Sequence, residues 1–179
     1  MLAGKLTGLR AIELDDLAQL LEWRNDPSLR RFFREYRELN SVQQNAWFEA
    51  RVNGDPSTRM FAIIELATDR LLGAAGLCYI DWVNQNADFS IYLGADDLYI
   101  DESFAPDAAR TMLRYGFEEL NLHRVWAEIY SIDLPKQKFF YELGFQREGV
   151  HRQTHWTEGQ WVDSLFYGLL RSEFRVVQP

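Results

Sequence analysis

Cysteine, long apolar runs and an excess of basic charge are all missing from this sequence, and each absence excludes a class of protein. The 179 residues include one cysteine, Cys78, so a disulfide framework and a cysteine metal cluster are both excluded and a buried thiol is expected. No stretch approaches the ~20 apolar residues of a membrane span, and the first ten residues lack the apolar run of a signal peptide. We therefore expect a soluble, cytoplasmic protein that is not bound to a membrane.

Basic residues are few, at 19 lysines and arginines against 27 aspartates and glutamates, which gives a formal net charge of −8. Nucleic-acid binding is disfavoured, because it depends on neutralising phosphates with basic side chains. An amine substrate is mildly favoured, although acidity that only keeps the protein in solution explains the charge more simply. The three histidines have no ligand partners at useful spacing, so no metal site is expected.

Apolar residues, by contrast, are abundant, at 47% hydrophobic and 15% aromatic, which is typical of one packed domain over 1–179. Ser41 and Gln44 form the capping box of one predicted helix. The predicted helices are 13–26, 41–53, 106–120 and 133–145, and the predicted strands are 6–12, 60–68, 70–80, 86–94, 123–130 and two flanking a Glu158-Gly159 turn. This order predicts an α/β fold with a mixed central sheet of about seven strands and about four helices.

Glycine is missing from one place where its absence matters. Residues 99–113 contain a helix start, with Pro106 in the first turn, and the positive end of a helix dipole is a good seat for an anion. Yet no glycine lies just upstream of the helix, within 99–105, and Asp101 and Glu102 stand where an incoming anion would meet like charge. The segment predicts an anion seat that binds weakly.

Four stretches, taken with the order of elements, resemble one family: LRAIELDDLAQLLEWRND, LNLHRVWAEIYS, YELGFQREG and DSLFYGLL. The chain is similar to the GCN5-related N-acetyltransferases (GNAT), and within them to the ribosomal-protein alanine acetyltransferases. The resemblance implies a GNAT-like domain that transfers an acyl group, acetyl above all, from acetyl-CoA to the amine of a small molecule, an amino sugar or a protein N-terminus. It leaves the oligomeric state open, with a homodimer among the expectations.

The resemblance also assigns residues to the acyl donor. The family's pyrophosphate loop, Arg/Gln-x-x-Gly-x-Gly/Ala, falls on 100–105, where Ser103, Phe104 and Ala105 would offer their amides but only Ala105 fits the pattern. The resemblance gives three further positions a role toward the donor. The backbone of Ile91, Tyr92 and Leu93 would hold the acyl group, and Asp133 stands at the helix N-terminus that contacts the cofactor. Phe140 stands where the family has a tyrosine that acts as general acid, and it has no hydroxyl. For Asp133 an ordinary N-cap is the simpler role.

Glu128 aligns with a glutamate that serves as general base in this branch, and burial at a strand end would raise its pKa toward neutrality. The alternative, which we weigh equally, is that Glu128 only pairs with a nearby arginine. Asp88 is a second candidate base, although strand alternation favours placing it on the solvent face.

Substrate-binding residues in the family come from the first two helices and the last hairpin. The candidates here are Trp23, Arg24, Asn25, Phe33, Tyr36, His151, His155 and Trp156. Aromatic residues of this kind are more often part of a core. Three functions therefore stay open: an acyl-CoA-dependent N-acyltransferase, a binding or regulatory protein on the same scaffold, and a transferase that uses another acyl carrier.

Overall fold

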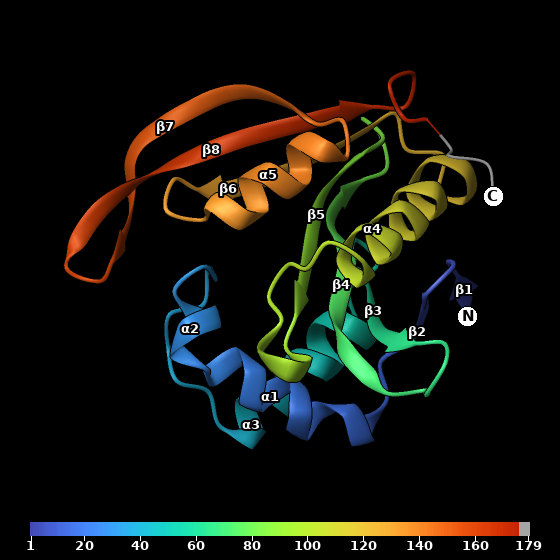
Figure 1. Cartoon of the computed structure of the whole chain (residues 1–179), viewed down its shortest axis with the longest axis vertical. Helices are drawn as coiled ribbons and strands as arrows, with labels where there is room; N and C mark the ends of the chain where they lie inside the picture. The colour runs from blue at the N-terminus through green and yellow to red at the C-terminus, as the bar shows by residue number, and fades with distance from the viewer. Residues whose placement is uncertain (176–179) are drawn as a thin grey trace.

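The computed structural model describes residues 1–175, which form an eight-stranded mixed sheet and five α-helices (Figure 1). The strands are β1 (Leu2–Ala3), β2 (Thr7–Ala11), β3 (Arg59–Glu65), β4 (Leu71–Asp81), β5 (Asn86–Leu93), β6 (Arg124–Tyr130), β7 (Gln146–Thr157) and β8 (Gln160–Leu170). The helices are α1 (Leu17–Asn25), α2 (Pro27–Arg30), α3 (Ser41–Trp47), α4 (Phe104–Arg114) and α5 (Leu134–Glu142). The predicted α/β class is confirmed, with two short elements, β1 and α2, that the periodicity did not reveal.

The sheet has the strand order β1-β2-β3-β4-β5-β6-β8-β7, and all its pairs are antiparallel except β5 with β6. That parallel pair extends only over 86–88 and 124–126. Beyond Asp88 the two strands separate, so the carboxyl half of β5 is paired with β4 but not with β6. The resulting wedge in the middle of the sheet positions the candidate site.

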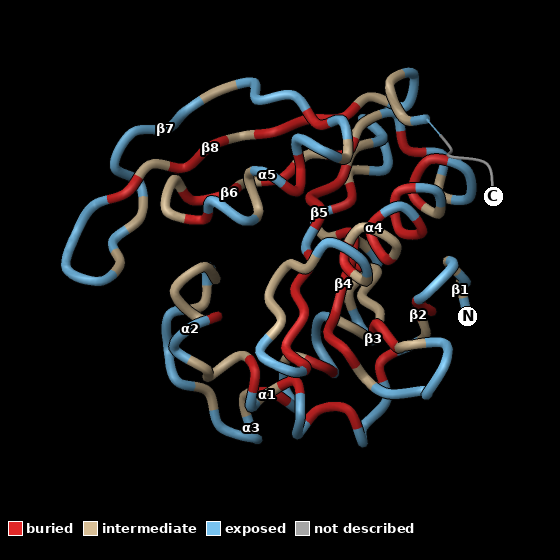
Figure 2. The backbone as a smooth tube through the Cα atoms, viewed as in Figure 1, coloured by how far each residue is buried: buried red, intermediate tan, exposed pale blue. Residues whose placement is uncertain are grey.

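Helix α4 forms much of the core, because its inner face carries small and apolar residues that allow close packing. Ala105, Ala108, Ala109, Met112 and Leu113 are fully buried, and α4 contacts β2, β4 and β5. Figure 2 shows that α4 and the central strands are largely buried, whereas the end of the β7–β8 hairpin is exposed. A π-helical turn, Tyr115–Glu119, continues α4, so the predicted helix over 106–120 is two elements.

The predicted capping box of α3 is wrong by one residue. The N-cap is Asn40, whose side chain accepts from the Gln43 N–H at 3.0 Å while Gln43 accepts from the Asn40 N–H. Asparagine caps helices as well as serine does, and Asn40 has the extended backbone that an N-cap needs. Gln44, the other predicted partner, is buried instead.

Asp107, in the first turn of α4, ties the N-terminal segment to the core. Its carboxylate accepts from the N–H groups of Lys5, Leu6 and Thr7 at 2.8–2.9 Å and from the Thr7 hydroxyl at 2.7 Å. Asp107→Ala leaves these donors unpaired, so we expect it to lower the free energy of unfolding by about 1.5 kcal/mol. Urea denaturation measures this, with the exposed Asp15→Ala as control; equal values for the two variants would contradict the role.

No helix within residues 1–175 is long and apolar enough to cross a membrane. In the same described part of the chain, no group of three or more histidine, cysteine, aspartate or glutamate side chains could hold a metal ion.

Candidate active site

A cavity of about 390 Å³ opens where β5 and β6 separate. Its lining residues come from α1 and the segment after α2 on one side and from β6 and α5 on the other, and Figure 1 shows how these elements are arranged. Seven residues predicted from the sequence to take part in the site line it: Arg24, Phe33, Asp88, Ile91, Tyr92, Glu128 and Phe140. Residues from opposite ends of the chain are therefore brought together around one cavity.

The backbone of β5 presents alternate residues to the wedge. The Gly94 N–H donates to the Leu72 carbonyl at 2.9 Å, and hydrogen-bonded pairs alternate along an antiparallel ladder. The even-numbered residues Tyr92 and Gly94 therefore bond to β4, whereas Ile91 and Leu93 direct their backbone groups away from β4, toward the wedge. The Tyr92 backbone is therefore directed toward β4 while its ring lines the cavity, and its role toward the donor stays a prediction.

Leu93 faces the wedge, but its N–H is already used. It donates to the Tyr99 carbonyl at 2.9 Å, within the loop that joins β5 to α4. Leu93 is fully buried and does not line the cavity. Of the three predicted backbone positions, Ile91 is the one that lines the cavity and also directs its backbone into the wedge.

Asp88 lies at the point where the strands separate and is 3% exposed. The expectation of a solvent-facing side chain is wrong, because β5 is an inner strand and Ala87, Asp88 and Phe89 are all buried. Its carboxylate accepts from Arg34 Nη1 at 2.6 Å. Burial raises the pKa of Asp88, and the Arg34 guanidinium opposes that rise.

Glu128, on β6, lines the same cavity, and its side chain is 23% exposed. One carboxylate oxygen accepts from Arg34 Nε at 3.1 Å and the other from Ser164 Oγ on β8 at 2.6 Å. Thr154 Oγ1 in turn donates to Ser164 Oγ at 2.7 Å. Glu128 thus pairs with an arginine and also faces the cavity, and its role as general base stays a prediction.

Sequence reasoning missed Arg34 and Ser164. Arg34 bridges the two carboxylates. Burial acts to lower the pKa of its guanidinium, but Asp88 and Glu128 outweigh it and hold that pKa above its ordinary value. The signal for Arg34 was its place in a basic cluster after the first helices, RRFFREYR. Ser164 had none, because only the register of β8 against β6, which pairs Tyr130 with Ser164, brings it near Glu128.

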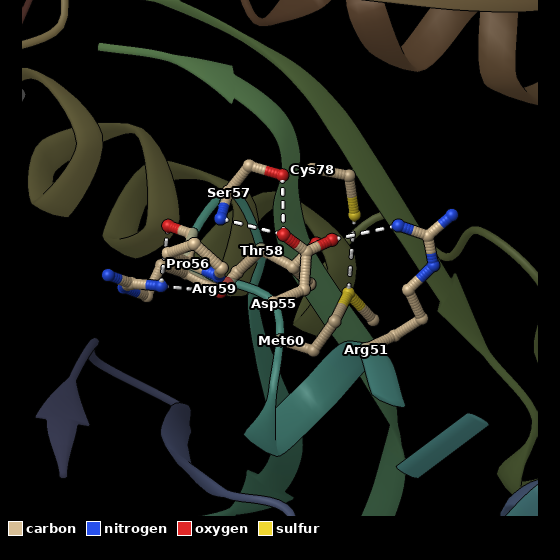
Figure 3. Close-up of polar contacts among 8 residues, drawn as sticks. All are labelled: Arg51, Asp55, Pro56, Ser57, Thr58, Arg59, Met60 and Cys78. Atoms are coloured by element: carbon tan, nitrogen blue, oxygen red, sulfur yellow. Dashed lines mark hydrogen bonds and ion pairs between the residues drawn. The ribbon is translucent and has the colours of Figure 1, made fainter. Parts of the chain in front are cut away.

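The far wall of the cavity is built by the turn before β3 and by β4. Figure 3 shows the Asp55 carboxylate between Ser57 and Arg51, with the Arg51 ion pair at 2.9 Å. The Cys78 thiol donates to the Met60 sulfur at 3.7 Å. Burial raises the pKa of Cys78 to about 12, so this half-buried thiol stays protonated at neutral pH and is a poor nucleophile.

Arg24, on α1, offers the cavity a cation with spare hydrogen-bonding capacity. Its guanidinium lies 6.0 Å from the ring centre of Phe33 and 5.7 Å from that of Trp47. Its buried Nε has no hydrogen-bond partner among the described residues. A planar guanidinium between aromatic rings is suited to a carboxylate or phosphate.

The start of α4 has its own anion in place. The Asp101 carboxylate accepts from the N–H groups of Ser103 at 3.0 Å, Phe104 at 2.9 Å and Ala105 at 2.7 Å. These hydrogen bonds lower the pKa of Asp101, although burial opposes them. Glu102 points elsewhere and pairs with Lys138 at 3.0 Å. The amides predicted to receive a pyrophosphate are thus satisfied by the chain itself.

A family model described as an acetyltransferase (GNAT) domain matches residues 7–146, more than three quarters of this chain. The chain belongs to this family. It is therefore an enzyme of the N-acetyltransferase class, as the resemblance implied.

Relatives cover almost the whole GNAT chain. An uncharacterised N-acetyltransferase, p20, from Bacillus licheniformis is 27% identical over 168 residues, which are 93% of each chain. The spermidine N(1)-acetyltransferase of Vibrio cholerae is 25% identical over 93% of this chain and 94% of its own. A crystal structure of spermidine N-acetyltransferase from Vibrio cholerae, in complex with CoA and spermine, shares the fold with a TM-score of 0.85 at 22% identity, over 94% of this chain and 97% of that one. None of these three is a ribosomal-protein alanine acetyltransferase.

Two predicted donor residues of this GNAT chain have structural roles. Asp133 is the N-cap of α5, where it accepts from the Lys136 N–H at 3.1 Å and from the Tyr99 hydroxyl. Phe140 is fully buried, and its ring packs against Phe89 and Phe145. No hydroxyl replaces that of the family's tyrosine at this register.

Several predicted substrate residues lie outside the cavity lining. Trp23 is 9% exposed and packs so closely on Gly94 that a β-carbon there would come within 2.2 Å of the ring. Asn25 bonds twice to the backbone of Leu39, and Tyr36 is 77% exposed. Each candidate of the last hairpin packs on another aromatic ring: His155 is stacked on Tyr130, His151 is tilted against Phe166, and Trp156 meets Trp161 edge-on. For His155, burial lowers the pKa.

Proposed function

We propose that this chain acetylates the amine of a small molecule, with an acetyl thioester, acetyl-CoA, as the donor. The observation that carries the proposal is the wedge between β5 and β6, which places the free backbone edge at Ile91 and the carboxylates of Asp88 and Glu128 around one cavity. An acyl group and an amine need to be held side by side for transfer. The cavity volume of about 390 Å³ suits a small molecule better than a folded protein.

The two ends of the donor fit this chain differently. The thioester end fits, because the backbone of Ile91 faces the wedge and can bond to an extended acyl-pantetheine arm. The diphosphate end does not fit, because Asp101 occupies the amides at the start of α4. When bound, the donor supplies a carbonyl carbon that an amine can attack with release of a thiol.

Glu128 is the residue we assign to accept the proton of the amine. It is more accessible from the cavity than Asp88, and its two oxygens are held in place by Arg34 and Ser164. Asp88 has the role of a positioning residue, which anchors Arg34 through its 2.6 Å contact. A carboxylate positioned in this way can act as a general base near neutral pH.

The acceptor that we propose carries an anionic group besides its amine. The cavity is lined by four cationic side chains, Arg24, Arg34, Arg51 and Lys136, and by three anionic ones, Glu35, Asp88 and Glu128. A polyamine, which the named Vibrio cholerae relative acetylates, would add several positive charges to this lining. A carboxylate on the acceptor would instead pair with Arg24, whose Nε has no partner among the described residues.

The test measures acceptor-dependent thiol release from acetyl-CoA and identifies the N-acetyl product by mass spectrometry. The acceptors are amino acids, amino sugars and spermidine at equal concentration. We expect an amino acid to exceed spermidine in kcat/KM by about tenfold, since one close ionic hydrogen bond gives a discrimination of that order. Arg24→Met should remove that preference while sparing amino sugars. Failure of every amine to release thiol would refute the transferase proposal.

A further inference from the structure

We propose that Asp101 makes this enzyme indifferent to the diphosphate of its donor, so that acetyl-pantetheine, which lacks a diphosphate, serves as well as acetyl-CoA. The inference rests on the proposed function, because it concerns the donor of the same transfer. With either donor, the amine nitrogen bonds to the acetyl carbon, the carbon–sulfur bond breaks and the pantetheine thiol leaves as the amine loses its proton. Only recognition of the donor differs.

The first observation is the hydrogen bonding of Asp101. Three consecutive amides, those of Ser103, Phe104 and Ala105, donate to its two carboxylate oxygens, and so does the Ser103 hydroxyl. Amides at the start of a helix are the groups that bind a phosphate. Because the resident carboxylate is tethered to the same loop, its effective concentration at these amides is high, and a diphosphate must displace it before it can bind.

The second observation concerns the same loop where it meets β5. The Leu93 N–H, which faces the wedge, donates to the Tyr99 carbonyl of the loop over 94–103. An amide carbonyl is the group that a pantetheine arm would offer to this N–H. The loop thus takes one wedge-facing N–H from the pantetheine arm, which both donors share, and three amides from the diphosphate, which only acetyl-CoA carries.

Contacts on both sides hold this loop where it is. The Tyr99 ring stacks on Phe32 with ring centres 4.9 Å apart, and its hydroxyl donates to Asp133 at the start of α5. Glu102 is tied to Lys138 of α5. The loop is therefore anchored by side chains from two other parts of the chain, which favours the closed arrangement of Asp101 over one open to a diphosphate.

Calorimetric titration with CoA and with pantetheine tests the inference directly. The wild type should bind the two ligands within about threefold of each other. Asp101→Gly frees three amides, so it should tighten CoA binding by about tenfold, which is the effect of one or two ionic hydrogen bonds at a helix start. The same substitution should leave pantetheine binding unchanged. Glu102→Gln is the matched control; it removes a charge from the same loop without freeing an amide, and CoA affinity should change less than threefold.

Inorganic pyrophosphate gives a second readout that needs no acyl transfer. At millimolar concentration it should raise the melting temperature of the Asp101→Gly variant but not that of the wild type. If the glycine variant does not fold, Asp101→Asn, which keeps a capping oxygen without the charge, should show the same effects at smaller size.

Two outcomes would overturn the inference: wild-type binding of CoA more than tenfold tighter than that of pantetheine, or equal tightening by the Asp101→Gly and Glu102→Gln variants. Failure of the transferase proposal would look different. No thioester would then acetylate any amine, whereas pyrophosphate would still distinguish the variant from the wild type.

Discussion

Glu128→Gln should lower kcat/KM for amine acetylation by about a hundredfold at neutral pH, the loss typical for removal of a general base. The glutamine side chain can still accept a hydrogen bond from Ser164 or Arg34, whose present hydrogen bonds to Glu128 are 2.6 Å and 3.1 Å long. Its neutral carboxamide cannot take a proton from the substrate amine. The expected loss is therefore in proton transfer, with the shape of the cavity retained.

Glu148→Gln is the matched control for this prediction. Glu148 also pairs with an arginine, Arg124, but it is not part of the cavity lining. We expect the control to keep activity within twofold of the wild type, with initial rates measured across several amine concentrations. Activity of the Glu128→Gln variant within the same twofold would remove Glu128 from the role of base and leave the pairing with Arg34 as its function.

The order of helices and strands was predictable because short sequence patterns indicate where each element begins and ends. The Glu158-Gly159 turn was recognisable as a hairpin, and both residues adopt positive φ, at 50° and 77°. Gly144, just after the end of α5, likewise has a φ of 93°, the left-handed conformation in which a glycine often ends a helix. Such features depend on neighbours in sequence, so one sequence suffices to locate them.

The site was less predictable, because its contacts join distant segments. Asp88 is buried by the position of β5 inside the sheet, which no alternation within 86–94 could reveal. The bridge from Arg34 to Asp88 and Glu128 spans residues far apart in the chain. Asp101 was recognisable from the sequence as a negative charge next to the expected anion seat, but only the structure shows that its carboxylate accepts from the amides at the start of α4. The assignment of Glu128 and Asp88 to catalysis stays a prediction.

Arg34→Met should lower the free energy of unfolding by about 2 kcal/mol at pH 7.5. The variant leaves the Asp88 carboxylate, whose side chain is 4% exposed, without its 2.6 Å partner. Breaking a buried ion pair costs about 3–5 kcal/mol, and the lower figure reflects the 43% exposure of the Arg34 side chain. Arg30→Met, which removes an exposed pair with Glu38 at 3.3 Å, is the control and should cost well under 1 kcal/mol.

The pH dependence of this loss identifies Asp88 as its cause. Burial already raises the pKa of Asp88, and Arg34 is the first of the groups that lower it, so the variant should raise the pKa further. A carboxyl whose pKa is higher in the folded than in the unfolded protein binds more protons when folded, and stability then falls as pH rises from about 4 toward the folded pKa. The deficit of Arg34→Met should therefore be largest at pH 7.5 and shrink toward pH 5 in urea denaturation. An equal deficit at both pH values would mean that the lost packing of the arginine stem, rather than the charge of Asp88, accounts for the effect.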